Sequence, residues 1–221
     1  MGHITYPFEA LPEEQMIERA DAFYELMDRR RSIRFFSDKP VPRHLIERAI
    51  QTAGTAPSGA HRQPWTFVAI DDPEVKREIR TAAEAEEYES YTNRMNEEWL
   101  EALEPIGTNW QKPFLETAPY IVICFAQNHG FNEDGSRQKH YYVQESVGLA
   151  CGMFIAALHN MGLVTLTHTP SPMRFLTNIL GRPGNERPYI LFPVGYPTED
   201  ATVPDFGRKP LDEILVWNKG E

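Results

Sequence analysis

The sequence has no apolar run that approaches the roughly 20 residues needed to span a bilayer, and it is short of basic side chains. Its 221 residues include 22 lysines and arginines against 32 aspartates and glutamates, which gives a formal net charge of −10. A chain this acidic is a poor ligand for the phosphates of nucleic acid. Residues 1–14 contain neither the basic nor the apolar segment of a signal peptide. We therefore expect a soluble protein that binds neither nucleic acid nor membranes.

Cysteine is also scarce. Cys124 and Cys151 lie far apart in apolar stretches, which predicts two buried thiols in a reducing cytoplasm. Neither has a basic neighbour in sequence that would lower its thiol pKa, so a cysteine nucleophile is not expected. The seven histidines show no metal-ligand spacing. We therefore expect no metal site.

The common motifs for nucleotide binding and hydrolysis are absent. There is no Gly-x-Gly-x-x-Gly after a strand, no Walker A loop, no Gly-x-Ser-x-Gly elbow and no Cys-x-x-Cys pair. The composition is that of an ordinary globular protein, with 41% hydrophobic and 24% charged residues. This length and apolar content suffice for one domain, residues 1–221, with a sizeable core.

Hydrophobic spacing predicts helices interspersed with short apolar strands. The expected helices cover residues 13–29, 42–53, about 74–103, 141–161 and 172–180, and the expected strands cover 65–70, 120–126, 164–167 and 189–194. Residues 129–139 form a predicted polar loop, and the tail from residue 201 is predicted to run extended across a surface. This order of elements predicts an α+β fold, an α/β sandwich with a mostly central sheet.

The helix expected over about 74–103 is poor in core residues. Eight glutamates crowd it between residues 84 and 104, so it has little apolar surface to bury. We predict a mobile cover more than a core element. Glu87 and Tyr91 are four residues apart in it and therefore share a helix face.

Three segments are candidates for binding a small ligand. Arg29–Arg34 places four arginines and a serine in six residues of an acidic chain; it either binds phosphate, with Arg208 as a partner, or is the solvated basic end of a helix. Ala56–His61 either brings backbone donors close to a flat ligand or is a plain turn. Thr165–Pro170 ends a strand with hydroxyls that either donate to a ring nitrogen or are ordinary strand residues.

Together these segments resemble the nitroreductase superfamily of FMN enzymes, and within it the iodotyrosine deiodinase family. The matching motifs include Arg30-Arg31-Ser32-Ile33-Arg34, Thr52–His61 followed by Gln63-Pro64-Trp65, Pro193–Pro197 and Ala201–Asp205. The resemblance runs from about Met27 to Ile214 without a large gap. It implies a nitroreductase-like fold whose central, mostly antiparallel sheet is flanked by helices. It also implies an active-site lid at about 84–112 and a homodimer with a domain-swapped tail at about 198–221. Gly148 and Gly152, four apart on one helix, would let another backbone approach closely.

The resemblance also assigns roles around an FMN cofactor. The residues that would bind FMN are Arg30, Arg31, Ser32, Ile33, Arg34, Ser58, Thr167, His168, Thr169 and Arg208, with Ser58 reaching the flavin from the partner subunit. The Thr169 hydroxyl would donate to flavin N5, which makes Thr169 the catalytic residue. The family usually shows a run of threonines here, so the role of His168 stays open.

Glu87, Tyr91 and Lys112 match the family's substrate clamp, and Ala60 would offer its backbone N–H to the substrate phenolate. A clamp of this composition suits an amino-acid zwitterion, because an anion faces the ammonium and a cation faces the carboxylate. The implied activity is FMN-dependent reductive dehalogenation of halogenated tyrosines, with electrons from an external donor, NAD(P)H or a reductase. Two alternatives stay open: a general NAD(P)H-dependent nitroreductase or quinone reductase, and a non-catalytic protein that binds halotyrosine or flavin.

Overall fold

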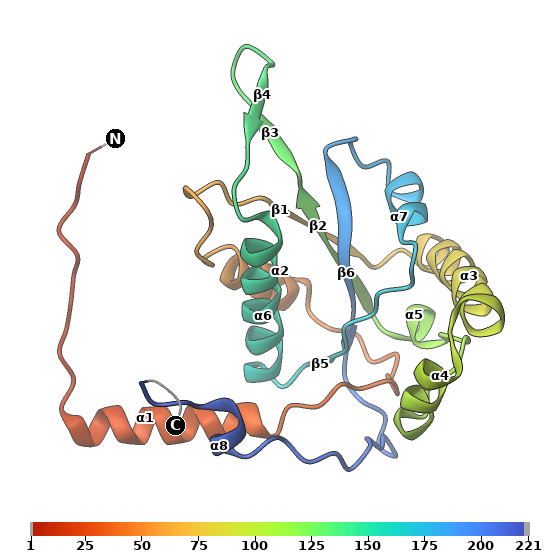
Figure 1. Ribbon diagram of the computed structural model, residues 1–221, viewed down its shortest axis with the longest axis horizontal. Coiled ribbons are helices and arrows are strands. Elements are labelled where there is room, and N and C mark those ends of the chain that lie inside the picture. The colour runs from red at the N-terminus through yellow and green to blue at the C-terminus, as the bar shows by residue number, and fades with distance from the viewer. Residues whose placement is uncertain (1, 219–221) are drawn as a thin grey trace.

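The computed structural model describes residues 2–218 and is built around a four-stranded antiparallel sheet in the order β1-β2-β6-β5 (Figure 1). The strands are β1 (Trp65–Ile70), β2 (Tyr120–Gln127), β6 (Glu186–Gly195) and β5 (Val164–Thr165). Every pairing in this sheet is antiparallel. The predicted α+β architecture with a central antiparallel sheet is confirmed.

β2 divides the core because its side chains alternate between two faces. Val122 and Cys124 belong to one buried cluster, and Ile121, Ile123 and Phe125 belong to the other. A strand buried on both faces reads as a continuous apolar run, and β2 does so from Tyr120 to Ala126. The register against β6 shifts between Cys124 and Phe125.

Helices cover both faces of the sheet. The first cluster is closed by α2 (Arg43–Ala53) and α6 (Val143–Asn160), and the second by α3 (Pro73–Glu89), α5 (Phe114–Thr117) and α7 (Arg174–Ile179). α3 starts where the Asp72 carboxylate accepts hydrogen bonds from two backbone amides of the first turn, with Pro73 in the first helical position. Figure 1 shows α2 and α6 on one side of the sheet, and α3, α5 and α7 on the other.

The single helix expected over about 74–103 is wrong in one respect, because the chain breaks it into pieces. After α3 a widened turn, η1 (Ser90–Arg94), is closed by an i→i+5 hydrogen bond from Met95 N–H to the Ser90 carbonyl at 2.9 Å. Asn96 then caps α4 (Glu97–Leu103) by accepting from Trp99 N–H at 2.9 Å. A short 3₁₀ turn, η2 (Glu104–Ile106), follows.

Two expectations for connecting segments are also wrong. The predicted polar loop at 129–139 is a hairpin of β3 (His129–Phe131) and β4 (Arg137–Lys139), which projects above the sheet in Figure 1. The tail is extended over 201–210 but then forms a short helix, α8 (Leu211–Ile214). Residues 219–221 of the expected tail lie outside the described residues.

α1 (Glu13–Asp28) reaches away from the sheet instead of packing on it (Figure 1). None of its residues is buried, and Met16, Ile17 and Phe23 are more than half exposed. Leu149 on α6 is exposed as well. None of the helices within residues 2–218 combines the length and apolar character needed to cross a membrane.

Candidate functional site

The arginine segment lies where α1 ends and the chain turns toward β5. Ser32 bridges to Thr165, and Ile33 N–H donates to the Thr165 carbonyl at 3.2 Å. Beside it lies a pocket of about 280 Å³, which we call the arginine pocket. Its lining consists of Arg30, Arg31, Ser32, Arg34, Ile106, Val203, Pro204, Phe206, Gly207 and Arg208.

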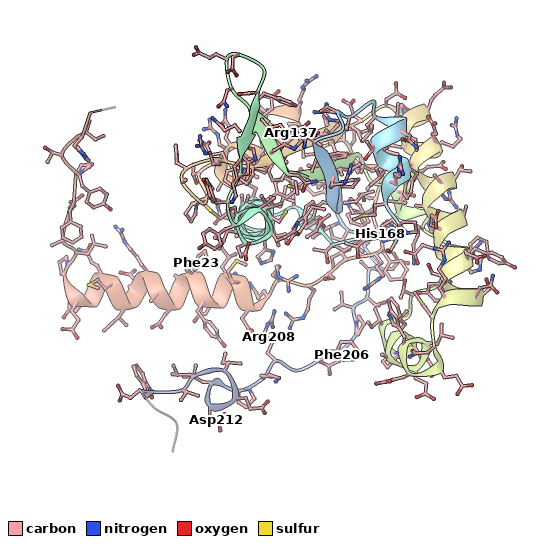
Figure 2. The ribbon with its side chains drawn as sticks, turned by 45° about the horizontal axis from the view of Figure 1, so that its top comes forward. Phe23, Arg137, His168, Phe206, Arg208 and Asp212 are labelled. Atoms are coloured by element: carbon pink, nitrogen blue, oxygen red, sulfur yellow. The ribbon has the colours of Figure 1, made fainter. Side chains whose placement is uncertain are left out.

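Arg208 comes to this pocket from the tail (Figure 2). Its guanidinium donates to the Asp28 carboxylate at 2.9 Å and to the Arg30 carbonyl at 3.0 Å. The tail therefore closes one wall of the pocket, and the structure brings together the two clusters, Arg29–Arg34 and Arg208, that the sequence suggested as partners.

The electrostatics of the arginine pocket are those of a site prepared for an anion. Burial lowers the pKa of Arg30, and the neighbouring charges of Arg208 and Arg31 lower it further. Burial also lowers the pKa of Arg34. Like charges collected in an otherwise acidic chain destabilise one another, and an incoming phosphate would relieve this.

The segment after β5 alternates in the way of a strand. His168 pairs with Leu191 of β6, its N–H donating at 2.8 Å and its carbonyl accepting at 3.0 Å. Thr167 and Thr169 are exposed on one side, whereas His168 is buried on the other. The two threonines therefore share a face that the side chain of His168 does not.

The clamp residues Glu87, Tyr91 and Lys112 are brought together. Glu87 on α3 places a carboxylate oxygen 3.4 Å from Lys112 Nζ, and this ammonium lies 5.5 Å from the centre of the Tyr91 ring in η1. Lys112 is only 3% exposed. Its Nζ also donates to Thr108 Oγ1 at 3.2 Å and to the Asn109 carbonyl.

Burial dominates the protonation of this pair. Burial raises the pKa of Glu87, and the Lys112 ammonium only partly offsets that effect. Burial likewise lowers the pKa of Lys112, again against the attraction of Glu87. Both charges have thus lost much of their hydration before any ligand binds. A ligand that places an opposite charge beside each of them would therefore stabilise both charged forms.

The arginine pocket and the clamp are electrostatically connected through Arg34. Its positive charge contributes to the lowered pKa values of Lys112 and His168 and opposes the burial that raises the pKa of Tyr91. The charge of this one guanidinium therefore acts on groups of the clamp as well as on the arginine pocket that it lines.

The Ala56–His61 loop is held by local contacts and lies away from the clamp. Ser58 Oγ accepts from Gln63 N–H at 2.9 Å, and a Cβ on Gly59 would overlap the backbone of Tyr141. Ala60 has φ of 51°, in the left-handed region. In Figure 1 this loop follows α2 at the left of the sheet, whereas α3 and α4 lie at the right. Within this chain, Ser58 and Ala60 are not brought to the clamp.

Glu84 is a site residue that sequence reasoning missed. Its carboxylate accepts from Lys112 N–H at 2.6 Å and from Arg80 Nε at 2.8 Å. It thereby fixes the backbone that carries the clamp lysine. The i,i+4 spacing of Arg80 and Glu84 and the i,i+3 spacing of Glu84 and Glu87 are visible in the sequence and could have marked it.

The model of the nitroreductase family matches residues 27–196, so the chain belongs to that family. Its relatives include the iodotyrosine deiodinase of Haliscomenobacter hydrossis, 54% identical over 213 residues that cover 96% of each chain. Iodotyrosine deiodinase 1 of Homo sapiens is 49% identical over 217 residues, which cover 97% of this chain and 74% of the human one.

The fold agrees with a solved structure. A crystal structure of oxidized iodotyrosine deiodinase bound to FMN and 3-iodo-L-tyrosine matches with a TM-score of 0.76 and 31% identity, over 89% of this chain and 99% of that one. The nitroreductase-like fold expected from the sequence is therefore confirmed.

Proposed function

We propose that this protein is an FMN-dependent reductive dehalogenase of halogenated tyrosines. The observation that carries the proposal is the buried Glu87–Lys112 pair beside Tyr91, in a chain that also forms the arginine pocket. Nitroaromatics and quinones carry no zwitterion that such a buried pair of opposite charges could bind. The iodotyrosine deiodinases that the chain resembles over nearly its whole length support the same activity.

The arginine pocket fits the phosphate and ribityl chain of FMN. Arg30, Arg31, Arg34 and Arg208 supply cationic donors, and Ser32 adds a hydroxyl. Because the charges of Arg208 and Arg31 lower the pKa of Arg30, a phosphate dianion bound here would stabilise the charged form of Arg30. When bound, the reduced flavin supplies the electrons with which the carbon–halogen bond is broken.

The exposed threonines supply hydroxyls on the proposed flavin side. The hydroxyl of Thr169 would donate to the flavin ring, at N5 as the family resemblance implies, and Thr167 would line the same surface. Their shared exposed face is what such a surface requires. The protein's contribution here is orientation, since the cofactor carries the redox chemistry.

The clamp recognises the amino-acid part of the substrate. Glu87 accepts from the substrate ammonium, Lys112 donates to its carboxylate, and Tyr91 adds a directional hydrogen bond. Both charged groups are already dehydrated, so binding exchanges one set of partners for a larger one at little further desolvation cost. Segment 84–112 then acts as a lid over the substrate.

The working unit is a homodimer. Exposed apolar side chains gather on segments that pack little against the rest of the chain: Ile4, Tyr6 and Phe8, Met16, Ile17, Phe23 and Tyr24, and Leu211, Ile214, Val216 and Trp217. Exposed apolar surface on this scale is typical of an interface, and two-fold symmetry is its commonest form. A second copy would also bring Ser58 and Ala60 to the flavin and the substrate phenolate, which one chain does not do.

Electrons come from an external donor, NAD(P)H or a reductase. The free and buried thiols of Cys124 and Cys151 fit a reducing compartment such as the cytoplasm.

The test is to load the purified protein with FMN, reduce it with dithionite and add 3-iodotyrosine. We expect stoichiometric tyrosine and iodide. Reduction of nitroaromatics with no loss of iodide would instead identify a general nitroreductase. Tight binding of iodotyrosine without turnover would identify a binding protein.

A further inference from the structure

His168 is held more firmly than the threonines on either side of it. Two backbone hydrogen bonds to Leu191 fix its place in the strand, so alternation directs its side chain away from the face of Thr167 and Thr169. Its ring meets the Phe114 ring edge-on, with centroids 5.6 Å apart and an interplanar angle of 89°. Figure 2 shows His168 in the main body of the molecule, above Phe206 and Arg208 of the tail.

The His168 ring and Lys112 approach different oxygens of the same carboxylate. His168 Nδ1 lies 3.9 Å from Glu87 Oε1, and Lys112 Nζ lies 3.4 Å from Glu87 Oε2. The carboxylate is thus approached by one nitrogen at each oxygen. Its remaining lone pairs are available to a ligand.

The second ring nitrogen of His168 has no partner in the part of the chain that the structure describes. His168 is 7% exposed, and among residues 2–218 its buried Nε2 finds no hydrogen-bond partner. A polar ring buried with one nitrogen unpartnered costs stability. Such a ring at this place calls for an explanation other than packing, and Glu87 is the group that its Nδ1 faces.

The groups that face His168 keep it neutral. Burial lowers the pKa of His168 to about 3, and the positive charges of Lys112 and Arg34 contribute to the shift. The carboxylate of Glu87 is the negative group 3.9 Å from its Nδ1. A neutral imidazole carries one N–H. If that proton is on Nδ1, the ring orients the carboxylate without cancelling the charge that attracts an ammonium.

We propose that His168 is a positioning residue that holds one oxygen of Glu87 in place for the substrate ammonium, and so contributes to the preference for zwitterionic substrates. The proposal rests on the proposed function, because it takes Glu87 to be the ammonium site. The present 3.9 Å is too long for a hydrogen bond. Contacts of this kind often shorten only in the complex, and here an ammonium on Glu87 would fix the carboxylate that Nδ1 approaches.

The experiment uses the FMN-loaded protein and four variants: His168→Leu, His168→Gln, Glu87→Gln and the double variant His168→Leu/Glu87→Gln. Flavin fluorescence is titrated with 3-iodotyrosine and with a halophenol that lacks the zwitterion. We expect His168→Leu to weaken iodotyrosine about 10-fold and to leave the halophenol nearly unchanged. His168→Gln, which restores a neutral donor, should recover most of the loss. In the Glu87→Gln background His168→Leu should add little, because the group it acts through has lost its charge.

His140→Leu is the matched control. His140 is another buried histidine, 8% exposed, with Nδ1 2.9 Å from the Gln127 carbonyl on a different part of the sheet. This change should lower thermal stability without altering the ratio of the two affinities.

The outcomes separate the positioning role from the proposed function. An equal loss of affinity for both ligands in His168→Leu would overturn the positioning role alone. Fully additive losses of iodotyrosine affinity in the double variant would do the same. So would an unchanged iodotyrosine affinity. A wild-type protein that holds FMN but binds no iodotyrosine would overturn both.

Discussion

The arginine pocket and the clamp handle charge in opposite ways. The arginine pocket collects cations, among which Arg208 and Arg31 lower the pKa of Arg30, and it lies beside the tail. The clamp pairs one cation with one anion and closes over both, with Lys112 3% exposed. The first arrangement needs a ligand that brings net negative charge, whereas the second suits a ligand that carries both signs. The difference matches a phosphate on one side and a zwitterion on the other.

The largest effect is expected when the clamp loses its cation, because the clamp then no longer pairs two opposite charges. Lys112→Met leaves Glu87 buried beside no ammonium, and breaking such a pair costs about 3–5 kcal/mol of folding stability. We expect lowered thermal stability and a loss of halotyrosine affinity on the order of 100-fold. Calorimetry and flavin-fluorescence titration measure the two effects.

Lys76→Met controls for the burial of a lysine. Lys76 is 7% exposed and donates to the carbonyls of Glu116 and Ala118 at 2.9 and 2.8 Å. The Lys76→Met change should lower thermal stability but leave halotyrosine affinity unchanged. Equal loss of affinity in both variants would show that the clamp lysine has no special part in binding.

Removing the anion tests the other member of the pair. Glu87→Gln keeps size and shape but deletes the charge, and a hydrogen bond to a charged group is worth about 1.5–3 kcal/mol, so halotyrosine should bind about 10–150-fold more weakly. The affinity for a halophenol, which has no ammonium, should be nearly unchanged. Titration of both proteins with both ligands decides the matter. If both ligands weaken alike, segment 84–112 does not sense the zwitterion.

A change in the arginine pocket should lower the affinity for FMN more than the affinity for halotyrosine. Arg34→Ala removes one charged contact and should weaken FMN about 10–100-fold, measured by flavin release on dialysis. Once the variant is saturated with FMN, its halotyrosine affinity should change much less. Arg43→Ala, which removes an exposed i,i+4 pair with Glu47, should change neither. A colourless wild-type protein that takes up no FMN would contradict the assignment of this pocket.

Lowering the pH should also distinguish the clamp from the arginine pocket. As the pH falls, Glu87 is protonated before ordinary carboxylates, because its pKa is raised. Halotyrosine affinity should therefore decrease with falling pH, by at most about tenfold per pH unit, while other carboxylates are still ionised. Stability has the opposite sign: the contribution of Glu87 to folding is present at low pH and is lost as pH rises through its raised pKa. FMN affinity should stay flat over this range. Titrations at several pH values check both, and Glu87→Gln should remove the slope.

The smallest effect is expected where residues 84–112 meet the segment that follows Thr169. Arg94 Nη1 donates to Glu86 at 2.8 Å and to the Ser171 carbonyl at 3.1 Å. These contacts are partly exposed, and such a pair is worth about 0.2–1 kcal/mol, so Arg94→Gln should weaken halotyrosine by at most about fivefold. It should also speed proteolysis within 84–112. Unchanged proteolysis would mean that other contacts hold the segment.

The sequence was sufficient where one local pattern determines the outcome. β2 was predicted because every residue from Tyr120 to Ala126 is apolar, and the burial of both faces explains why. The hairpin of β3 and β4 was missed because none of its strand residues is buried and because they show no alternation of apolar and polar side chains. The break after α3 carried a readable signal, since Asn96 followed by two glutamates is a helix start.

The site followed a similar rule. The shared face of Glu87 and Tyr91 follows from their spacing, but the approach of Lys112 depends on how the chain returns after η2, which no local pattern encodes. Only the family resemblance suggested it. The burial of His168 between two exposed threonines was open to inference from strand alternation, but its contact with Glu87 on another element was not.

The loop at Ala56–His61 has a consequence for attempts to evolve this protein in the laboratory. Ala60, His61 and Gln63 all hold positive φ, at 51°, 53° and 47°, although each has a side chain that disfavours it. Glycine at any of them would relieve a local cost, so selection for heat resistance alone would favour it. The same change would loosen the loop that holds the Ala60 amide. At residue 60, selection for heat resistance and selection for ligand affinity therefore favour different amino acids.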